Sequence, residues 1–379
     1  MTPPPDTDSG ATDGVDVFAP RQETFLARYP RKVKLAATVA LLALLIAPWF
    51  FFGDNDADAK KAKQTVVKAD PAFRAAAPES IKPLPASRTA PPPAAPLTSA
   101  EEAAIIALND ANDRSVRMAR APDPGITEDS AEGSLPKIGE DGRKPWQIYA
   151  RPFDNADKRP RVAIVMMNMG MSRVATDAVL QKLHANVTLA FDVQSQVVGS
   201  WMGRARQDGH ELLLSLPMEP FDYPRSDPGP NALLTNLPNS DNLQRLLWGL
   251  RQGTGYVGVT TISGSRFMTN PKKMLPILEV LRQRGLMVFD TRIVPHSVIK
   301  DFAKNMAIPV AVNTQRLDEI YAPDAIDAAL GQLEQSARVN GRAIGFALPT
   351  PVMIDRLENW IKQLPSHGVA LAPLSAMVE

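Results

Sequence analysis

The stretch VAIVMMNMG, from Val162 to Gly170, decides the fold of this chain. It is an unbroken apolar run that ends in a glycine turn, and from Ser172 onward apolar residues recur every three to four positions. A short, wholly apolar run indicates a strand that is buried on both faces, and the period that follows it indicates a helix. The stretch therefore predicts a buried parallel strand that leads into a helix.

The same unit recurs through residues 161–379. Further apolar runs that predict strands are Val187–Val193, Glu211–Met218, Tyr256–Ile262, Leu286–Thr291, Ile308–Asn313, Arg342–Pro349 and Val369–Ser375. Patterns that predict helices are Ser172–His184, Val197–Asp208, Asn239–Arg251, Pro271–Arg284, Ser297–Met306, Pro323–Val339 and Val352–Leu364. Alternation of this kind predicts an α/β fold with a parallel sheet and helices outside it. Seven or eight units in this length favour a closed, compact barrel over an open sheet.

The carboxyl ends of the strands are the place for chemistry in such folds. Met167 and Asn168 end the first strand, and neither side chain can act as an acid or a base. The Pro-rich loop 219–238 follows the third strand and belongs to the same face. Loops on this face commonly bind ligands.

Composition excludes several functions. The formal net charge is +1, and no basic stripe with interleaved aromatic residues occurs, so we expect no nucleic-acid partner. The chain contains no cysteine, which removes disulfides, thiolate catalysis and thiolate metal sites. Only four histidines are present, so a histidine-rich metal site is hard to build.

The N-terminal part predicts a membrane anchor. Residues 1–34 are polar, without a hydrophobic period, and are expected to be a disordered cytoplasmic segment. Leu35–Phe52 is an uncharged apolar run with about the length needed to cross a ~30 Å hydrocarbon core. Basic residues precede it and acidic residues follow it, which predicts one transmembrane helix with the remainder of the chain outside the cytoplasm. The alternative is a signal peptide that is cleaved near Ala57–Ala59.

Two segments join this anchor to the barrel. Residues 53–98 are rich in Pro, Ala and Lys and predict a disordered, extended spacer. Residues 99–160 are expected to be a short helix and an irregular segment packed on the barrel. A capping box of Ser99 and Glu102 starts the helix, which is predicted to run to about Met118. Its apolar residues include Ile105, Ile106 and Leu108. The aromatic anchors of the irregular segment are Trp146, Tyr149 and Phe153.

Five strings of residues carry a resemblance to a known family. They are GHELLLSLPMEP (209–220), PGP (228–230), GVTTISGSRF (258–267), RGLMVFDTR (284–292) and AIGFALPTP (343–351). Together they resemble the divergent polysaccharide deacetylase family, a bacterial envelope group related to metal-dependent carbohydrate deacetylases. The resemblance implies a deformed (β/α)7-8 barrel of the glycoside hydrolase/deacetylase type over 161–379. It also implies an ancestral activity that hydrolyses N-acetyl or O-acetyl groups on polysaccharide with a metal-bound water.

The metal ligands of that family pattern are replaced in this sequence. The pattern has an Asp pair and three His positions, because carboxylates and imidazoles bind zinc and an acid or base must handle the proton of the water. The residues at these positions are Met167, Asn168, Ser215, Ile262 and Leu348. The resemblance therefore implies a site without a metal cofactor and without the ancestral chemistry.

Asp290 is the one acid that stands where the family has it, and it is the catalytic candidate. Two interpretations of it stay open. It can form a structural ion pair with Arg266 or Arg292. Alternatively, it can belong to a non-standard site for zinc or another divalent metal, whose further candidate ligands are Asp192, Glu219, Asp222 and His296. The predicted ligand-binding mouth comprises Asn168, Ser215, Glu219, Arg266, Asp290 and Arg292.

These features predict a single-pass protein of the bacterial inner membrane, anchored through Leu35–Phe52, with its N-terminus in the cytoplasm and its barrel in the periplasm. We expect a catalytically degenerate deacetylase-like protein that binds polysaccharide, peptidoglycan or an envelope protein, with loop 219–238 as the surface for a protein. An active carbohydrate deacetylase with a non-standard metal site and a structural envelope scaffold are the alternatives.

Overall fold

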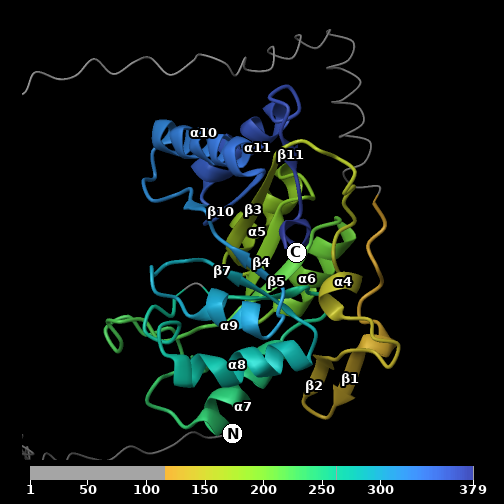
Figure 1. The fold of residues 1–379 in the computed structure, drawn as a ribbon, viewed down its shortest axis with the longest axis vertical. Helices are drawn as coiled ribbons and strands as arrows, with labels where there is room; N and C mark the ends of the chain where they lie inside the picture. The colour runs from red at the N-terminus through yellow and green to blue at the C-terminus, as the bar shows by residue number, and fades with distance from the viewer. Residues whose placement is uncertain (1–115, 262, 379) are drawn as a thin grey trace, which may run out of the picture. The chain divides into compact units, whose positions relative to one another are not determined.

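The computed structural model describes residues 116–261 and 263–378. The strands of its main sheet are β3 (Arg161–Met169), β4 (Thr188–Asp192), β5 (Leu212–Ser215), β6 (Gly258–Thr260), β7 (Met287–Asp290), β8 (Val310–Val312), β9 (Gln315–Arg316), β10 (Arg342–Ala347) and β11 (Ala370–Leu371). The main helices are α5 (Arg173–Lys182), α6 (Val198–Gln207), α7 (Asn239–Leu250), α8 (Pro271–Gln283), α9 (Ile299–Asn305), α10 (Pro323–Asn340) and α11 (Pro351–Gln363). The predicted alternation of strands and helices is confirmed (Figure 1).

The sheet is parallel, and its order is β8-β7-β6-β5-β4-β3-β10-β9, with β11 paired to β3. Strands β8 and β9 form no ladder with each other, but only Asn313 and Thr314 separate them. The backbone N–H of Asn313 donates to the carbonyl of Asp290 in β7, and that of Thr314 donates to the carbonyl of Ile344 in β10. One bent segment therefore joins the two ends of the sheet. The predicted parallel α/β architecture is confirmed as a half-barrel of parallel strands, whereas the predicted closed barrel is not formed by a continuous ladder among the described strands.

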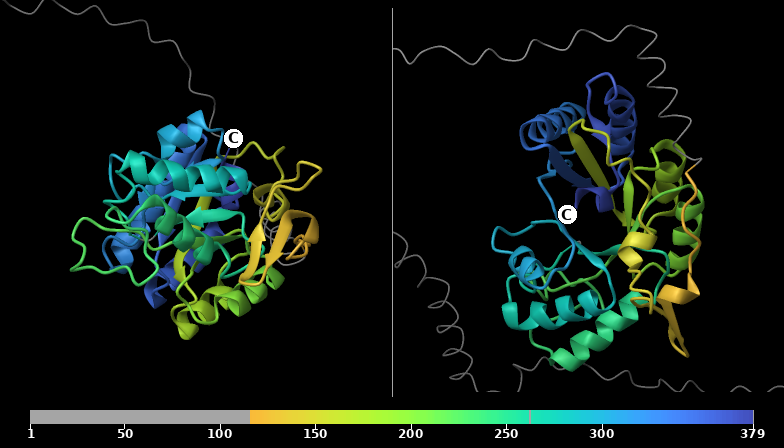
Figure 2. Two further views of the ribbon diagram at one scale, coloured as in Figure 1. Left: turned by 90° about the horizontal axis from the view of Figure 1, so that it is seen from below. Right: turned by 45° about the vertical axis from the view of Figure 1, so that its right-hand side comes forward.

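Two apolar layers lie on the two faces of the sheet. The outer layer packs the strands against the helices, and it includes Leu189, Leu212 and Val288. The interior layer is enclosed by the curved sheet, and it includes Ala190, Leu213 and Phe289. Successive side chains of a strand point to opposite faces, so these residues fix which positions face inward. Figure 2 shows the helices arranged around the strands.

The segment before the barrel is more regular than predicted. A hairpin of β1 (Thr127–Ser130) and β2 (Gly133–Pro136) forms, followed by the short helix α4 (Pro145–Ile148). Tyr149 is buried in the interior layer, and Trp146 and Phe153 pack against it, as expected of aromatic anchors. The segment 122–146 therefore has more regular structure than the predicted irregular segment, and the aromatic anchors pack on the interior layer. At the other end of the barrel segment, the predicted strand Val369–Ser375 is shortened to β11, and the 3-10 helix η4 (Leu374–Met377) begins within its last two residues.

Several predictions lie outside the described residues. They are the cytoplasmic segment, the anchor Leu35–Phe52, the spacer 53–98 and most of the helix that starts at Ser99. The predicted end of that helix is wrong, because residues 116–118 are not helical. Within residues 116–261 and 263–378, no helix is both long enough and apolar enough to span a bilayer.

Candidate functional site at the carboxyl ends of the strands

Four polar residues follow the inward-facing positions of β4, β5, β7 and β8. Each lies two residues after a side chain of the interior layer, namely Ala190, Leu213, Phe289 and Ala311. Alternation along each strand therefore aims Asp192, Ser215, Thr291 and Asn313 at the interior. We call these four residues the polar row. They end four strands at the carboxyl side of the sheet, which is where α/β folds bind ligands.

The pairing of the strands brings the members of the polar row together. Asp192 and Ser215 are register partners in neighbouring strands. Asp290 and Val312 are the last register partners of β7 and β8. Thr291 directly follows Asp290, and Asn313 directly follows Val312. Strand β6 lies between the two pairs, and the hydroxyl of its last residue, Thr260, donates to the carbonyl of Phe289 in β7. The polar row thus runs along one edge of the curved sheet.

Three members of the polar row carry buried polar atoms without a partner. Among the described residues, five buried side-chain N or O atoms make no hydrogen bond, and three of the five are Ser215 Oγ, Thr291 Oγ1 and Asn313 Oδ1. The three side chains are at most 6% exposed. Because a buried hydroxyl without a partner costs ~1–3 kcal/mol, such groups are rare, and each one calls for an explanation, of which a bound ligand or water is one. Their concentration in one row identifies the candidate site.

Two buried carboxylates lie at this site, Asp192 within the polar row and Asp290 next to it. Burial raises the pKa of the Asp192 carboxyl above its ordinary value, while a hydrogen bond from the Gln194 N–H partly offsets the effect. Burial likewise raises the pKa of Asp290, against the lowering effect of the Arg292 N–H, which donates to its carboxylate at 2.9 Å. Asp290 follows Phe289, so alternation places it on the outer face, behind the polar row. Asp290 therefore supports the polar row from the outer face and does not itself point into the interior.

The predicted ion pair of Asp290 was wrong. Within the described residues, Asp290 makes no salt bridge with Arg266 or Arg292, and the partner of Arg266 is Glu219 at 3.5 Å. Glu219 is 3% exposed and ties loop 219–238 together, because it accepts hydrogen bonds from both the N–H and the hydroxyl of Thr235. The Arg266 N–H also donates to the carbonyl of Glu219, which holds the two segments in contact.

Two predicted mouth residues have unusual backbone conformations. Asn168 at the end of β3 has φ of 57°, and Arg292 after β7 has φ of 51°, both in the left-handed region. Asn enters this region at low cost, whereas most side chains pay ~1–2 kcal/mol. At Asn168 the pairing of β3 with β4 also shifts, between Met166 and Met169. The first kink lies within β3, and Arg292 at the second is exposed.

A cleft of about 680 Å³ opens beside the carboxyl ends of β3 and β4. Its walls include Arg173, Gln194, Ser200 and Trp201, and the Arg204 guanidinium lies 5.6 Å from the centre of the Trp201 ring. Of the aromatic residues near the mouth, Phe221 is 55% exposed, whereas Phe267 is fully buried in the outer apolar layer. Phe267 is thus a core residue.

The structure therefore places three predicted mouth residues, Ser215, Glu219 and Asp290, in buried positions around the strand ends, and two, Arg266 and Arg292, at the exposed rim. Sequence reasoning did not select Thr291 and Asn313 as site residues. The available signal was their type, since each is the polar residue that ends an apolar run.

A parallel, barrel-like α/β domain with buried polar groups at the carboxyl ends of its strands is the class that this fold and site define. The model of the divergent polysaccharide deacetylase family matches residues 164–378, which is more than half of the chain. This chain belongs to the divergent polysaccharide deacetylase family.

Two relatives extend this assignment. The uncharacterized protein ATU2773 from Agrobacterium tumefaciens C58 has a crystal structure that matches this chain with a TM-score of 0.64 and 34% sequence identity. The match covers 65% of this chain and 100% of that one. The uncharacterized protein YibQ of Escherichia coli (strain K12) is 24% identical over 163 residues. That match covers 43% of this chain and only 50% of YibQ.

The side chains at the family's metal positions do not fit zinc. Met167 is 1% exposed and belongs to the interior apolar layer, and Leu348 packs against the same layer. Ser215 and Asn168 supply a neutral hydroxyl and a neutral amide, whereas zinc sites in proteins are built from thiolate, imidazole and carboxylate. Ile262 lies outside the described residues. In residues 116–261 and 263–378, no three acidic or histidine side chains gather closely enough to hold a metal ion.

Proposed function

We propose that this protein binds a glycan at its mouth and no longer performs the metal-dependent hydrolysis of its family's relatives. The observation that carries the proposal is the polar row with its unpartnered Ser215, Thr291 and Asn313 atoms. These groups suit sugar hydroxyl and amide groups, which both donate and accept hydrogen bonds. The apolar side chains at the former ligand positions Met167 and Leu348 support the loss of the metal chemistry.

We further propose that the protein is anchored in the bacterial inner membrane by Leu35–Phe52 and that the barrel faces the periplasm. The support is the charge asymmetry around this apolar run, which follows the positive-inside rule. A domain in that position meets peptidoglycan and other envelope polysaccharides. The spacer 53–98 gives it reach away from the membrane surface.

The experiment is a calorimetric titration of the protein with chitotetraose and with soluble peptidoglycan fragments. Replacing Thr291 with Val or Asn313 with Leu removes one polar partner each and should weaken binding about 5–10-fold, since a hydrogen bond contributes ~1 kcal/mol. Ser200→Ala, in the cleft outside the polar row, is the matched control and should leave the affinity unchanged. Equal affinities for all variants would refute glycan binding at the polar row.

A protein partner at loop 219–238 is the second candidate. One observation favours it: Phe221 exposes 55% of its surface, and the neighbouring Arg225 side chain is 85% exposed. Exposed aromatic and Arg side chains are typical of interface hot spots. Replacing Phe221 with Ser should then abolish capture of an envelope protein by cross-linking in cells while the fold and chitotetraose binding are retained. Unchanged capture would exclude this loop as the contact surface.

A further inference from the structure

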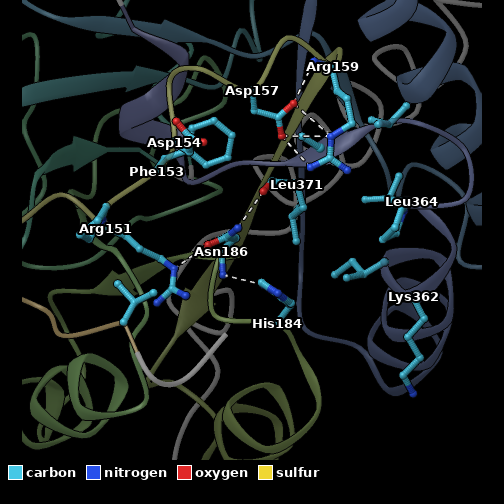
Figure 3. A pocket seen from close by; sticks show the side chains of 16 residues that line it. Arg151, Phe153, Asp154, Asp157, Arg159, His184, Asn186, Lys362, Leu364 and Leu371 are labelled. Atoms are coloured by element: carbon cyan, nitrogen blue, oxygen red, sulfur yellow. Dashed lines mark hydrogen bonds and ion pairs between the residues drawn. The ribbon is translucent and has the colours of Figure 1, made fainter. Parts of the chain in front are cut away.

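A second cavity, of about 800 Å³, lies at the end of the barrel opposite to the mouth (Figure 3). Its walls come from the segment before β3, from the loop that precedes β4, from the end of α11 and from β11. Its volume falls within the ~300–1,000 Å³ that is usual for binding pockets. The glycan proposal does not use it.

The wall of this cavity offers apolar surface to an occupant. The apolar lining includes Phe153, Ile361, Leu364 and Leu371. By contrast, several polar groups in the wall are already partnered, and Figure 3 shows the contacts of Arg159 and Asn186. Arg159 forms an ion pair with Asp157 at 2.6 Å. The Asn186 amide accepts a hydrogen bond from Arg151 and donates one to the carbonyl of Leu371. The cavity therefore suits an apolar segment better than a small polar ligand.

The path of the chain points to the occupant. Val116, the first described residue, lines this cavity. The position of the next residues is fixed, because the buried Arg206 guanidinium donates to the carbonyl of Ala119 at 2.7 Å. The described chain therefore begins at the wall of the cavity itself. Leu108 is eight residues earlier, a span of ~12 Å if helical and at most ~28 Å if extended.

That preceding segment has matching chemistry. Residues 99–115 read SAEEAAIIALNDANDRS, in which Ile105, Ile106 and Leu108 are the large apolar residues. Because the segment is attached at the cavity wall, its effective concentration there is of the order of mM, so weak intrinsic affinity is enough for docking. From these observations we infer that residues 99–115 dock in this cavity through Ile105, Ile106 and Leu108.

Engineered disulfides test the docking, because the natural chain contains no cysteine. The full-length protein carrying Ile105→Cys and Lys362→Cys is oxidised with copper phenanthroline, and the loop-closed form is separated by non-reducing electrophoresis. Lys362 lies on the rim of the cavity with a 66% exposed side chain. The control pair is Ile105→Cys with Arg225→Cys, which lies in the mouth loop and is 85% exposed.

Docking predicts at least a ~10-fold higher yield of the Lys362 cross-link than of the Arg225 cross-link. Adding Ile106→Asp should reduce that yield ~10-fold, whereas the matched change Asn112→Asp should not. Equal yields for the two pairs would overturn the inference, and so would a disulfide that joins two chains, since a second copy would then be the occupant. Circular dichroism verifies the fold of each variant. A failure of chitotetraose binding would leave these yields unchanged and would count against the glycan proposal alone.

Discussion

Replacing Ser215 with Ala should stabilise the free protein, which is the reverse of the usual effect of truncating a buried residue. The Ser215 side chain is 1% exposed, and its hydroxyl has no hydrogen-bond partner among the described residues. A buried hydroxyl without a partner costs ~1–3 kcal/mol, and its removal leaves only a very small cavity. We therefore expect a gain of ~1 kcal/mol, equivalent to a rise of ~2–4 °C in melting temperature for a domain of this size.

Ser195→Ala is the matched control, because the Ser195 hydroxyl is also buried but donates to the carbonyl of Gly170 at 2.8 Å. The same substitution should here lower stability by ~1 kcal/mol. Urea unfolding followed by fluorescence, together with thermal melts, gives both values. If Ser215→Ala lowers stability as much as Ser195→Ala does, then the Ser215 hydroxyl has a structural partner and the argument for a ligand-binding row fails.

Two further predictions concern other buried carboxylates. Burial raises the pKa of Glu211, and its hydrogen bonds, two of them from Ser375, offset only part of that effect. Because the folded state then holds the proton at pH values where the unfolded state has lost it, stability should fall as pH rises from ~4.3 to the raised folded pKa, by up to ~1.4 kcal/mol per pH unit. Urea titrations between pH 4 and 8 measure this slope, and a rise of stability over the same range would contradict it. Glu219→Ala should lower the free energy of unfolding by ~1–3 kcal/mol and speed proteolysis within loop 219–238, because it leaves both donors of Thr235 unpaired. Glu219→Gln keeps an acceptor and should lower it less. Equal proteolysis rates would show that Glu219 does not hold the loop.

The barrel could be predicted from the sequence because its strands are buried on both faces. Runs such as Val162–Met167 are wholly apolar and are bounded by helical periods, so their number and order follow from the pattern. The β1–β2 hairpin gave no such signal. Its first strand, TEDS, is polar and largely exposed, and its register sets Glu128 opposite Leu135, while Glu128 also pairs with Arg284 of the barrel. Tertiary contacts outweigh local preference in such strands.

The site was only partly predictable for a similar reason. Ser215 could be selected because the family resemblance marks its position. Thr291 and Asn313 matter because their polar atoms lack partners, and this is a property of the packed structure and not of the residue types. The partner of Arg266 was misassigned because loop 219–238 folds back and brings Glu219, which is distant in sequence, to within 3.5 Å. Ion pairs across long loops depend on that folding.

The loss of metal chemistry is the central claim, and the metal content of the purified protein tests it most directly. The protein is equilibrated with zinc, manganese, cobalt or copper, the excess is removed, and bound metal is measured by mass spectrometry. We predict no stoichiometric metal, because Met167, Asn168, Ser215 and Leu348 cannot supply the ligands that zinc needs. One metal ion per chain that is lost on replacing Asp290 with Ala would contradict the account and would favour an active deacetylase with a non-standard site.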